Sequence, residues 1–242
     1  MGRLPGALQQ PDHLVEPRKV TSVKPRSHEL VARNRDILER SLNGRFITEA
    51  TDSSLAPQHF ARYLAIEEQF VKAAVRVRAF TLFAEPNWDS VAHHAASIED
   101  LLGEQLTYFH DVRARHNAAP ADIGRAIELS SGLSTYVLGS VSSAGYAGAI
   151  VNMFAAETLY LEWCSRAAAS RELNPVLDLD AWIALHVSPS FRKQVGILGA
   201  FVEALPETTA EGGGSDEHLD AWFTAMLGAE DNFHDAIYFD GA

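Results

Sequence analysis

The amino-acid sequence predicts an all-α protein in which long helices form one bundle and one domain. Apolar residues recur at helical spacing (i, i+3, i+4, i+7) along most of the 242 residues. No alternating run bounded by turn residues predicts a strand. The segments between the helical patterns are short, and the chain has neither an internal repeat nor a linker that would divide it.

The first half of the chain is expected to form three helices. The first begins at Ser27 and ends at the stop signal Asn43-Gly44. The second begins at Pro57, which suits a first helical turn, and runs to about Phe83. The third covers 88–116.

The second half is expected to form four more helices. Pro120 opens one that reaches Gly145, and the next covers 146–169. A helix over 179–205 follows, and Pro189 is expected to interrupt it because proline has no amide hydrogen to donate. The last helix covers 216–238.

Composition bounds the class of protein. Residues 1–27 are rich in proline and basic side chains, and we expect them to be a flexible arm before a helical domain at 28–242. The net charge of −12 argues against a nucleic-acid partner. Neither a signal peptide nor an uninterrupted apolar stretch of membrane length is present, and the single cysteine, Cys164, suits a reducing compartment. We therefore expect a cytoplasmic protein without a membrane partner.

Three of the apolar stripes contain a glutamate in register. Glu67 is in step with Phe60, Tyr63, Leu64, Phe70, Val71 and Ala74. Glu157 and Glu230 occupy the same kind of position in the fifth and the last helix. A single such residue usually lies at the solvated edge of a stripe, but three on separate helices indicate an acidic pocket inside the bundle.

Such a pocket is suited to proton transfer. A lone buried carboxylate costs several kcal/mol unless it is paired, hydrogen-bonded or protonated. The nearest cations, Arg62, Arg76 and Arg78, are predicted to fall off the inward face. Burial and mutual repulsion should therefore raise the carboxyl pKa values toward neutrality. The carboxyls could then bind a cationic or amidine-like heterocycle and relay protons to it.

Other chemistries have weaker signals. A di-metal site in a helical bundle uses two Glu-x-x-His units, and here only the pair Glu230–His234, four residues apart, comes close. We expect neither a metal nor another cofactor. No G-x-S-x-G element, C-x-x-C pair or phosphate-binding glycine loop is present, and Cys164 is expected to be a small core residue.

Two segments resemble signatures of the TenA/thiaminase II family. FARYLAIEEQFV (60–71) resembles F-x-x-(Y/W)-L-x-Q-D-x-x-(F/Y), with Glu67 at the aspartate, and AEDNFHDAIY (229–238) resembles the closing E-x-x-F-W-x-x-(A/S). FAAETLYLEW (154–163) is similar to F-W-A-I-E-x-x-Y, a signature of the family branch that lacks the catalytic cysteine, with Glu157 at its glutamate. Ala156 lies at the position where the other branch carries that cysteine. The likeness covers about residues 28–240.

The resemblance implies a haem-oxygenase-like fold, a dimer or tetramer, and a small-molecule substrate. The implied activity is hydrolysis of an aminopyrimidine from damaged thiamin, with release of ammonia. Glu67 would hold the amine and amidine edge of the ring, while Glu157 and Glu230 would share proton transfer and activation of water. The implied substrate-binding residues are Tyr160, Phe70, Phe233, Tyr136, His234, His186 and Tyr63.

Departures from the family pattern leave alternatives open. Ile66 and Glu67 replace the glutamine and aspartate of the first signature, and His234 replaces a tryptophan of the last. His186 stands where an aromatic residue is usual. One alternative is a diverged enzyme of specialised metabolism with another small substrate. Another is a non-haem metal oxygenase on the same fold that uses Glu67, Glu157, Glu230 and His234, and a third is a module that binds without catalysis.

Overall fold

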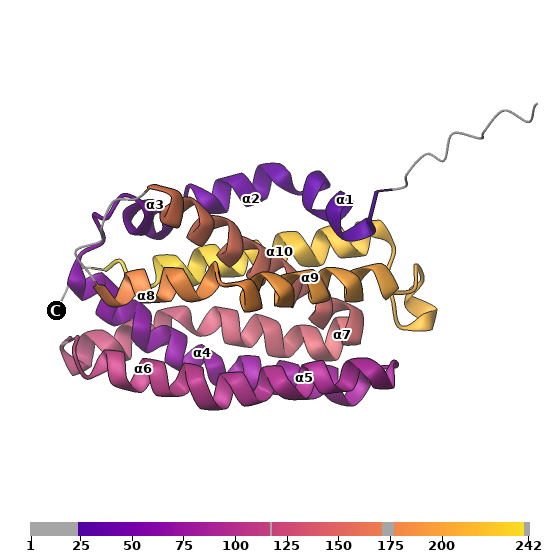
Figure 1. Cartoon of the computed structure of the whole chain (residues 1–242), viewed down its shortest axis with the longest axis horizontal. Coiled ribbons are helices and arrows are strands. Elements are labelled where there is room, and N and C mark those ends of the chain that lie inside the picture. The colour runs from indigo at the N-terminus through magenta and orange to yellow at the C-terminus, as the bar shows by residue number, and fades with distance from the viewer. Residues whose placement is uncertain (1–23, 117, 171–176, 240–242) are drawn as a thin grey trace, which may run out of the picture.

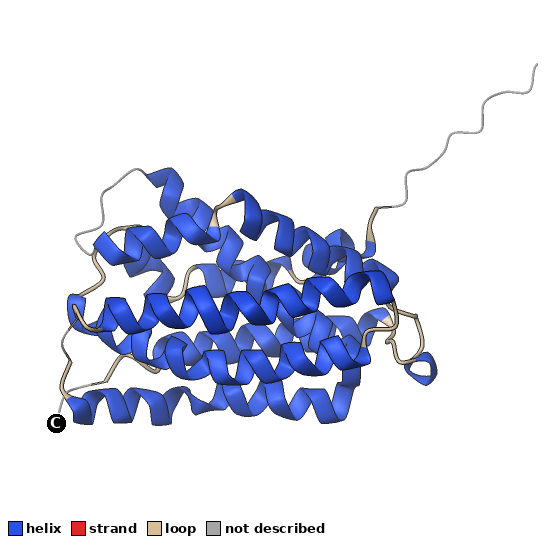
Figure 2. Cartoon of the chain, turned by 60° about the horizontal axis from the view of Figure 1, so that its bottom comes forward, coloured by secondary structure: helices blue, strands red, loops and turns tan. Residues whose placement is uncertain are grey.

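The computed structural model describes residues 24–116, 118–170 and 177–239, and all regular structure within them is helical (Figure 2). The helices run along the long axis of the molecule (Figure 1). The all-α bundle predicted from the sequence is thus confirmed. The α-helices in chain order are α1 (Arg26–Arg33), α2 (Arg35–Leu42), α3 (Arg45–Thr51), α4 (Pro57–Ala84), α5 (Trp88–Asp100), α6 (Leu106–Arg113), α7 (Pro120–Ser170), α8 (Leu177–His186), α9 (Pro189–Ala204) and α10 (Asp216–Asp235).

The beginning of the chain differs from the prediction. The first helix is divided at Asn34, whose side-chain amide donates to the Leu30 carbonyl at 2.9 Å and to Asp220 at 2.8 Å. The stop at Gly44 is correct, but α3 follows at once, too short for its apolar period to be recognised.

The boundary of the arm at residue 27 was wrong by two residues. Arg26 and Ser27 belong to α1, and their backbone amides donate to the Glu203 carboxylate at 2.7 and 2.8 Å. Residues 1–23 of the predicted arm lie outside the described residues.

The predicted third helix contains a π-helical turn, Leu101–Gln105, between α5 and α6. Ser97 and Phe109 are both buried, and α4 packs against both helices. A regular α-helix rotates by about 100° per residue, so these two residues would point about 120° apart. The wider π turn compensates for this difference and keeps both helices facing α4.

α7 is the central helix and packs against α4, α9 and α10. It breaks at Gly145, whose φ of 62° and ψ of −150° are accessible to glycine at little cost, at the predicted junction between two helices. Of the described helices, α7 alone is long and apolar enough to cross a membrane. Half of its most apolar window is buried within the bundle. Pro189 starts α9, so the predicted interruption is also correct.

Candidate active site

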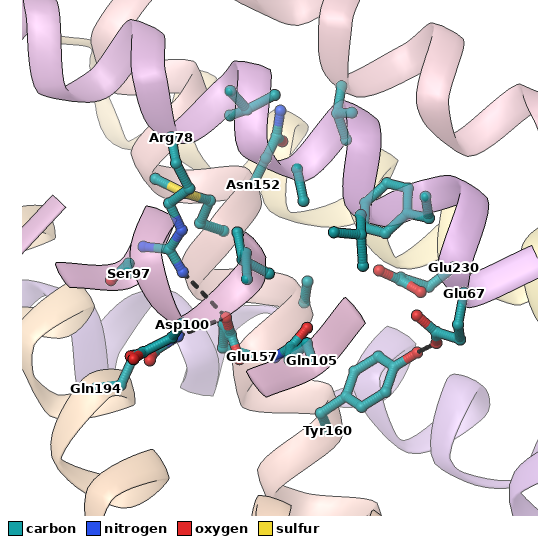
Figure 3. A pocket seen from close by; sticks show the side chains of 18 of the residues that line it. Glu67, Arg78, Ser97, Asp100, Gln105, Asn152, Glu157, Tyr160, Gln194 and Glu230 are labelled. Atoms are coloured by element: carbon teal, nitrogen blue, oxygen red, sulfur yellow. Dashed lines mark hydrogen bonds and ion pairs between the residues drawn. The ribbon is translucent and has the colours of Figure 1, made fainter. Parts of the chain in front are cut away.

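A cavity of about 140 Å³ lies between α4, both halves of α7, α8, α9 and α10, and the end of α5 with the π turn forms another part of its wall (Figure 3). An engineered apolar cavity of about 150 Å³ holds one benzene molecule, so this volume suits a single six-membered ring. The wall is mainly apolar, with a few convergent polar groups, which is typical of a site for a small molecule. The polar and charged residues of the wall are Glu67, Arg78, Ser97, Asp100, Gln105, Ser140, Asn152, Glu157, Tyr160, His186, Gln194 and Glu230.

All three glutamates of the apolar stripes line this one cavity. Glu67 comes from α4, Glu157 from the second half of α7, and Glu230 from α10. Figure 3 shows Glu67 and Glu230 close together, with Glu157 farther along the cavity. The helical periodicity therefore located three carboxyl groups that the bundle brings together, while their roles stay predictions.

Glu67 forms a close pair with Tyr160. The Tyr160 hydroxyl donates to Glu67 Oε1 at 2.5 Å, and Tyr63 OH and His234 Nε2 lie 3.3 and 3.4 Å from the same hydroxyl. Burial raises the pKa of Glu67 to about 7, although the hydrogen bond from Tyr160 opposes the shift. Near neutral pH, Glu67 can therefore exist either as an acid or as a carboxylate.

This pKa predicts a pH-dependent effect of Glu67→Gln on stability. Between the ordinary value of 4.5 and about 7, the folded protein keeps a proton that the unfolded chain releases, so this group's contribution to stability is lost as the pH rises. The variant should gain up to about 3 kcal/mol relative to the wild type between pH 4.5 and pH 8. Urea unfolding of both proteins at several pH values measures this difference, and a difference independent of pH would contradict the assignment.

Glu230 is buried, and one of its carboxyl oxygens lacks a hydrogen-bond partner among the described residues. The residue is 2% exposed, and the unpartnered oxygen is Oε2. Burial, followed by the charges of Glu67 and Glu157, raises the pKa of Glu230 well above its usual range. Burial thus favours the protonated form of this side chain, a carboxylic acid that can give up a proton to a group in the cavity.

Glu157 forms an ion pair with Arg78, a cation that was predicted to point away from the inward face. Arg78 Nη2 and Gln194 Nε2 donate to Glu157 Oε1 at 3.1 and 2.9 Å, whereas no described residue is recorded as bonded to Oε2. Burial raises the pKa of Glu157, and the charge of Arg78 opposes that shift. Glu157 thus combines a restrained oxygen with one that is free to accept a proton.

The prediction that Arg78 falls off the inward face was wrong. Glu67, Val71, Ala74 and Arg78 follow one another at spacings of four, three and four, and all four line the cavity. The predicted apolar stripe ends at Ala74, one turn before Arg78. The same prediction was correct for Arg76, which is exposed. Arg62 is buried, at 5% exposed, but it forms an ion pair with Asp122 and is not part of the cavity wall.

The predicted substrate-binding residues divide into two layers. Tyr160, Phe70 and His186 line the cavity. The others stand behind the wall: Phe233 packs on Phe70 with ring centroids 5.7 Å apart, Tyr63 and His234 contact Tyr160, and Tyr136 donates to Asn152 Oδ1 at 3.0 Å.

The two unusual histidines are neutral at physiological pH. Burial lowers the pKa of His186 to about 4 and that of His234 to about 3. His186 Nδ1 lies 2.8 Å from the Trp182 carbonyl, an arrangement that assigns its proton to Nδ1 and leaves Nε2 as an acceptor. In the part of the chain that the structure describes, no three His, Cys, Asp or Glu residues are grouped as metal ligands. The set proposed for a metal oxygenase, Glu67, Glu157, Glu230 and His234, is therefore not gathered around one point.

Sequence reasoning also missed the polar residues that reach the cavity from α5, the π turn and α9. Asp100, Gln105 and Gln194 line the wall, but they lie on no apolar stripe that marks an inward direction. Of the cavity residues that were missed, only Arg78 could have been predicted from the sequence, because its helical spacing from Glu67 places both on one face.

The fold and this carboxyl-lined cavity define the class: an all-α bundle with a small-molecule cavity between its helices. No protein-family model and no curated protein matches the chain. Among solved structures, a TenA homologue from Pyrococcus furiosus is 22% identical, covers 88% of this chain and 100% of its own, and has a TM-score of 0.70. A TenA homologue from P. horikoshii is 11% identical over 88% of this chain and 98% of its own, with a TM-score of 0.72. A protein from Sulfolobus solfataricus described as a TenA-like thiaminase is 15% identical over 89% of this chain and 96% of its own, with a TM-score of 0.66. The chain thus has the fold of the TenA homologues, as its motifs predicted.

Proposed function

We propose that the protein is a TenA-type hydrolase that removes an amino group from an aminopyrimidine without a metal. The observation that carries this proposal is the presence of three glutamates in different environments around a cavity whose volume suits one ring. The cavity wall contains Ala156 and no cysteine among the described residues, while Cys164 is buried elsewhere in the core. Carboxyl chemistry is therefore better supported than attack by a thiolate.

The proposal gives each carboxyl group one role. Glu67, oriented by Tyr160, binds the amine and ring-nitrogen edge of the pyrimidine, because a carboxyl group can accept from the N–H and donate to the ring nitrogen. Glu230 donates a proton to the leaving amine. Glu157 accepts a proton from water through Oε2, while Arg78 and Gln194 fix its Oε1.

The reaction converts an aminomethyl group and water into a hydroxymethyl group and ammonia. A bond forms between the water oxygen and the methylene carbon as the bond between that carbon and the amine nitrogen breaks. The water proton goes to Glu157, and the nitrogen receives the proton of Glu230. Exchange with solvent then restores both carboxyl groups, so no oxidant or reductant is consumed.

The direct test is ammonia release from 4-amino-5-aminomethylpyrimidine by the purified protein, with and without prior dialysis against a chelator. We expect turnover that survives the chelator. Turnover that requires a re-added metal would overturn the metal-free assignment. Binding of the pyrimidine without ammonia release would favour the non-catalytic alternative.

A second candidate is an enzyme of the same type that acts on a different small amine in specialised metabolism. The observation that favours it is Arg78, a buried cation inside the cavity that none of the motif resemblances includes. Release of ammonia from other heterocyclic amines, with none from the aminomethylpyrimidine, would support this candidate.

A further inference from the structure

Among the ionisable residues of the cavity wall, two have a buried side-chain atom with no hydrogen-bond partner among the described residues. These atoms are Glu230 Oε2 and Arg78 Nη1, and their residues are 2% and 5% exposed. The uncharged Trp182 Nε1 is a third such atom in the wall. Leaving a buried donor or acceptor unpaired is unfavourable, and more so when the group is charged. Glu230 Oε2 and Arg78 Nη1 are therefore positioned to be satisfied by a ligand.

The role proposed for Glu230 accounts for its free oxygen, but nothing yet accounts for the free nitrogen of Arg78. Nη2 donates to Glu157, and Thr81 Oγ1 bonds to the carbonyl of Arg78 rather than to its guanidinium. Figure 3 shows the guanidinium between Ser97 and Glu157, within the cavity lining. The ion pair alone therefore uses only part of the donor capacity of this side chain.

Arg78 stands at the opposite end of the cavity from the Glu67–Tyr160 pair. The two residues share one face of α4, and eleven positions at about 1.5 Å each separate them by about 16 Å along the helix axis. A ring held at Glu67 would thus direct a substituent, rather than its own edge, toward Arg78.

Charge balance indicates what that substituent is. The charge of Arg78 is already matched by Glu157, 3.1 Å away. Asp100 also lines the cavity, and Figure 3 shows it at the same end as Arg78 and Glu157. A carboxylate or phosphate would meet these two acidic groups, whereas an uncharged oxygen can accept the free N–H without adding charge.

We propose that Arg78 is a specificity-determining residue that donates through Nη1 to an uncharged carbonyl or amide oxygen on the substrate. This inference rests on the proposed function and adds that amino heterocycles with a neutral oxygen acceptor bind more tightly than those without one. Arg78 therefore has two contacts, one to Glu157 and one to the ligand.

The test compares the binding of three probes by calorimetry: 4-aminopyrimidine, its 5-carboxamide and its 5-carboxylate. The wild type should bind the carboxamide about 10- to 100-fold more tightly than the unsubstituted ring, as expected for a hydrogen bond from a charged donor. The carboxylate should show no such gain. Arg78→Met should remove the preference for the carboxamide.

Two further variants keep the result interpretable. Arg78→Lys keeps a cation beside Glu157 but lacks the planar guanidinium, so its preference for the carboxamide should be several-fold lower than that of the wild type. This variant still tests the role of Arg78 if Arg78→Met does not fold. Arg76→Lys changes the exposed arginine two residues earlier on α4 and should leave all three affinities unchanged.

The outcomes separate the two proposals. Equal affinities of the wild type for the carboxamide and the unsubstituted ring, or a preference for the carboxylate, would overturn the role of Arg78 while leaving the aminopyrimidine site intact. A preference for the carboxamide that survives both Arg78 substitutions would overturn it as well. Failure of every probe to bind the wild type would overturn the proposed function and, with it, this inference.

Discussion

A Glu230→Gln variant is expected to lose about 10²- to 10⁴-fold in kcat/KM for ammonia release, which is the usual contribution of a positioned general acid. Glutamine has nearly the same shape as the protonated side chain but no acidic proton. The proton donor disappears while the packing of α10 is preserved. Steady-state kinetics with an ammonia-coupled readout measures the loss.

The same substitution should change stability by no more than about 1 kcal/mol at pH 7, because burial favours the uncharged form of Glu230 and no described residue bonds to its Oε2. Wild-type activity should also decline as the pH rises through the elevated pKa of Glu230. Glu217→Gln, in the exposed first turn of α10, is the matched control and should leave both quantities unchanged. A Glu230→Gln variant with full activity would remove this residue from the reaction.

The largest effect on stability is expected from Glu157→Gln, at about 3–5 kcal/mol, because it removes the carboxylate that forms the ion pair with the buried Arg78 guanidinium. Arg78→Met should cost less, because Glu157 can take up a proton and become neutral, whereas a guanidinium does not lose its proton at any ordinary pH. Urea unfolding of the two single variants measures this asymmetry.

The double variant Arg78→Met, Glu157→Gln completes the cycle. Removing both charges should recover most of the stability lost in Glu157→Gln, and the coupling energy reports the ion pair in the cavity. Additive losses would show that the two side chains do not depend on each other. The double variant also distinguishes two explanations for an inactive Glu157→Gln protein. One is loss of the general base, and the other is loss of the folded structure.

Helical periodicity was sufficient to predict much of this molecule. The stripes of α4, α7 and α10 each fix the direction of one glutamate, because a helix with one buried face has little freedom to rotate. Pro57, Gly145 and Pro189 mark helix ends through backbone constraints that act locally. These features depend on neighbouring residues alone, so they can be recognised without knowledge of the fold.

The features that were missed depend on contacts between distant segments. Whether Arg78 belongs to the stripe of Glu67 is decided by Glu157 and Gln194, which approach it from α7 and α9. Tyr63 and His234 share stripes with the glutamates, yet they stand behind Tyr160 rather than in the wall. Periodicity gives a direction from the helix axis, but it does not give the depth at which the cavity begins.

The π turn at 101–105 has a consequence for how such a pocket can change over generations. Leu101 and Gln105 lie in the cavity wall within a turn that is wider than an α-helical one. A π turn corresponds to an α-helix that has absorbed an inserted residue, so gaining or losing one codon here would exchange the side chains that meet the substrate. The carboxyl groups lie on α4, α7 and α10 and would keep their positions. Selectivity could thus be altered by length variation at one place while the reacting groups are inherited unchanged.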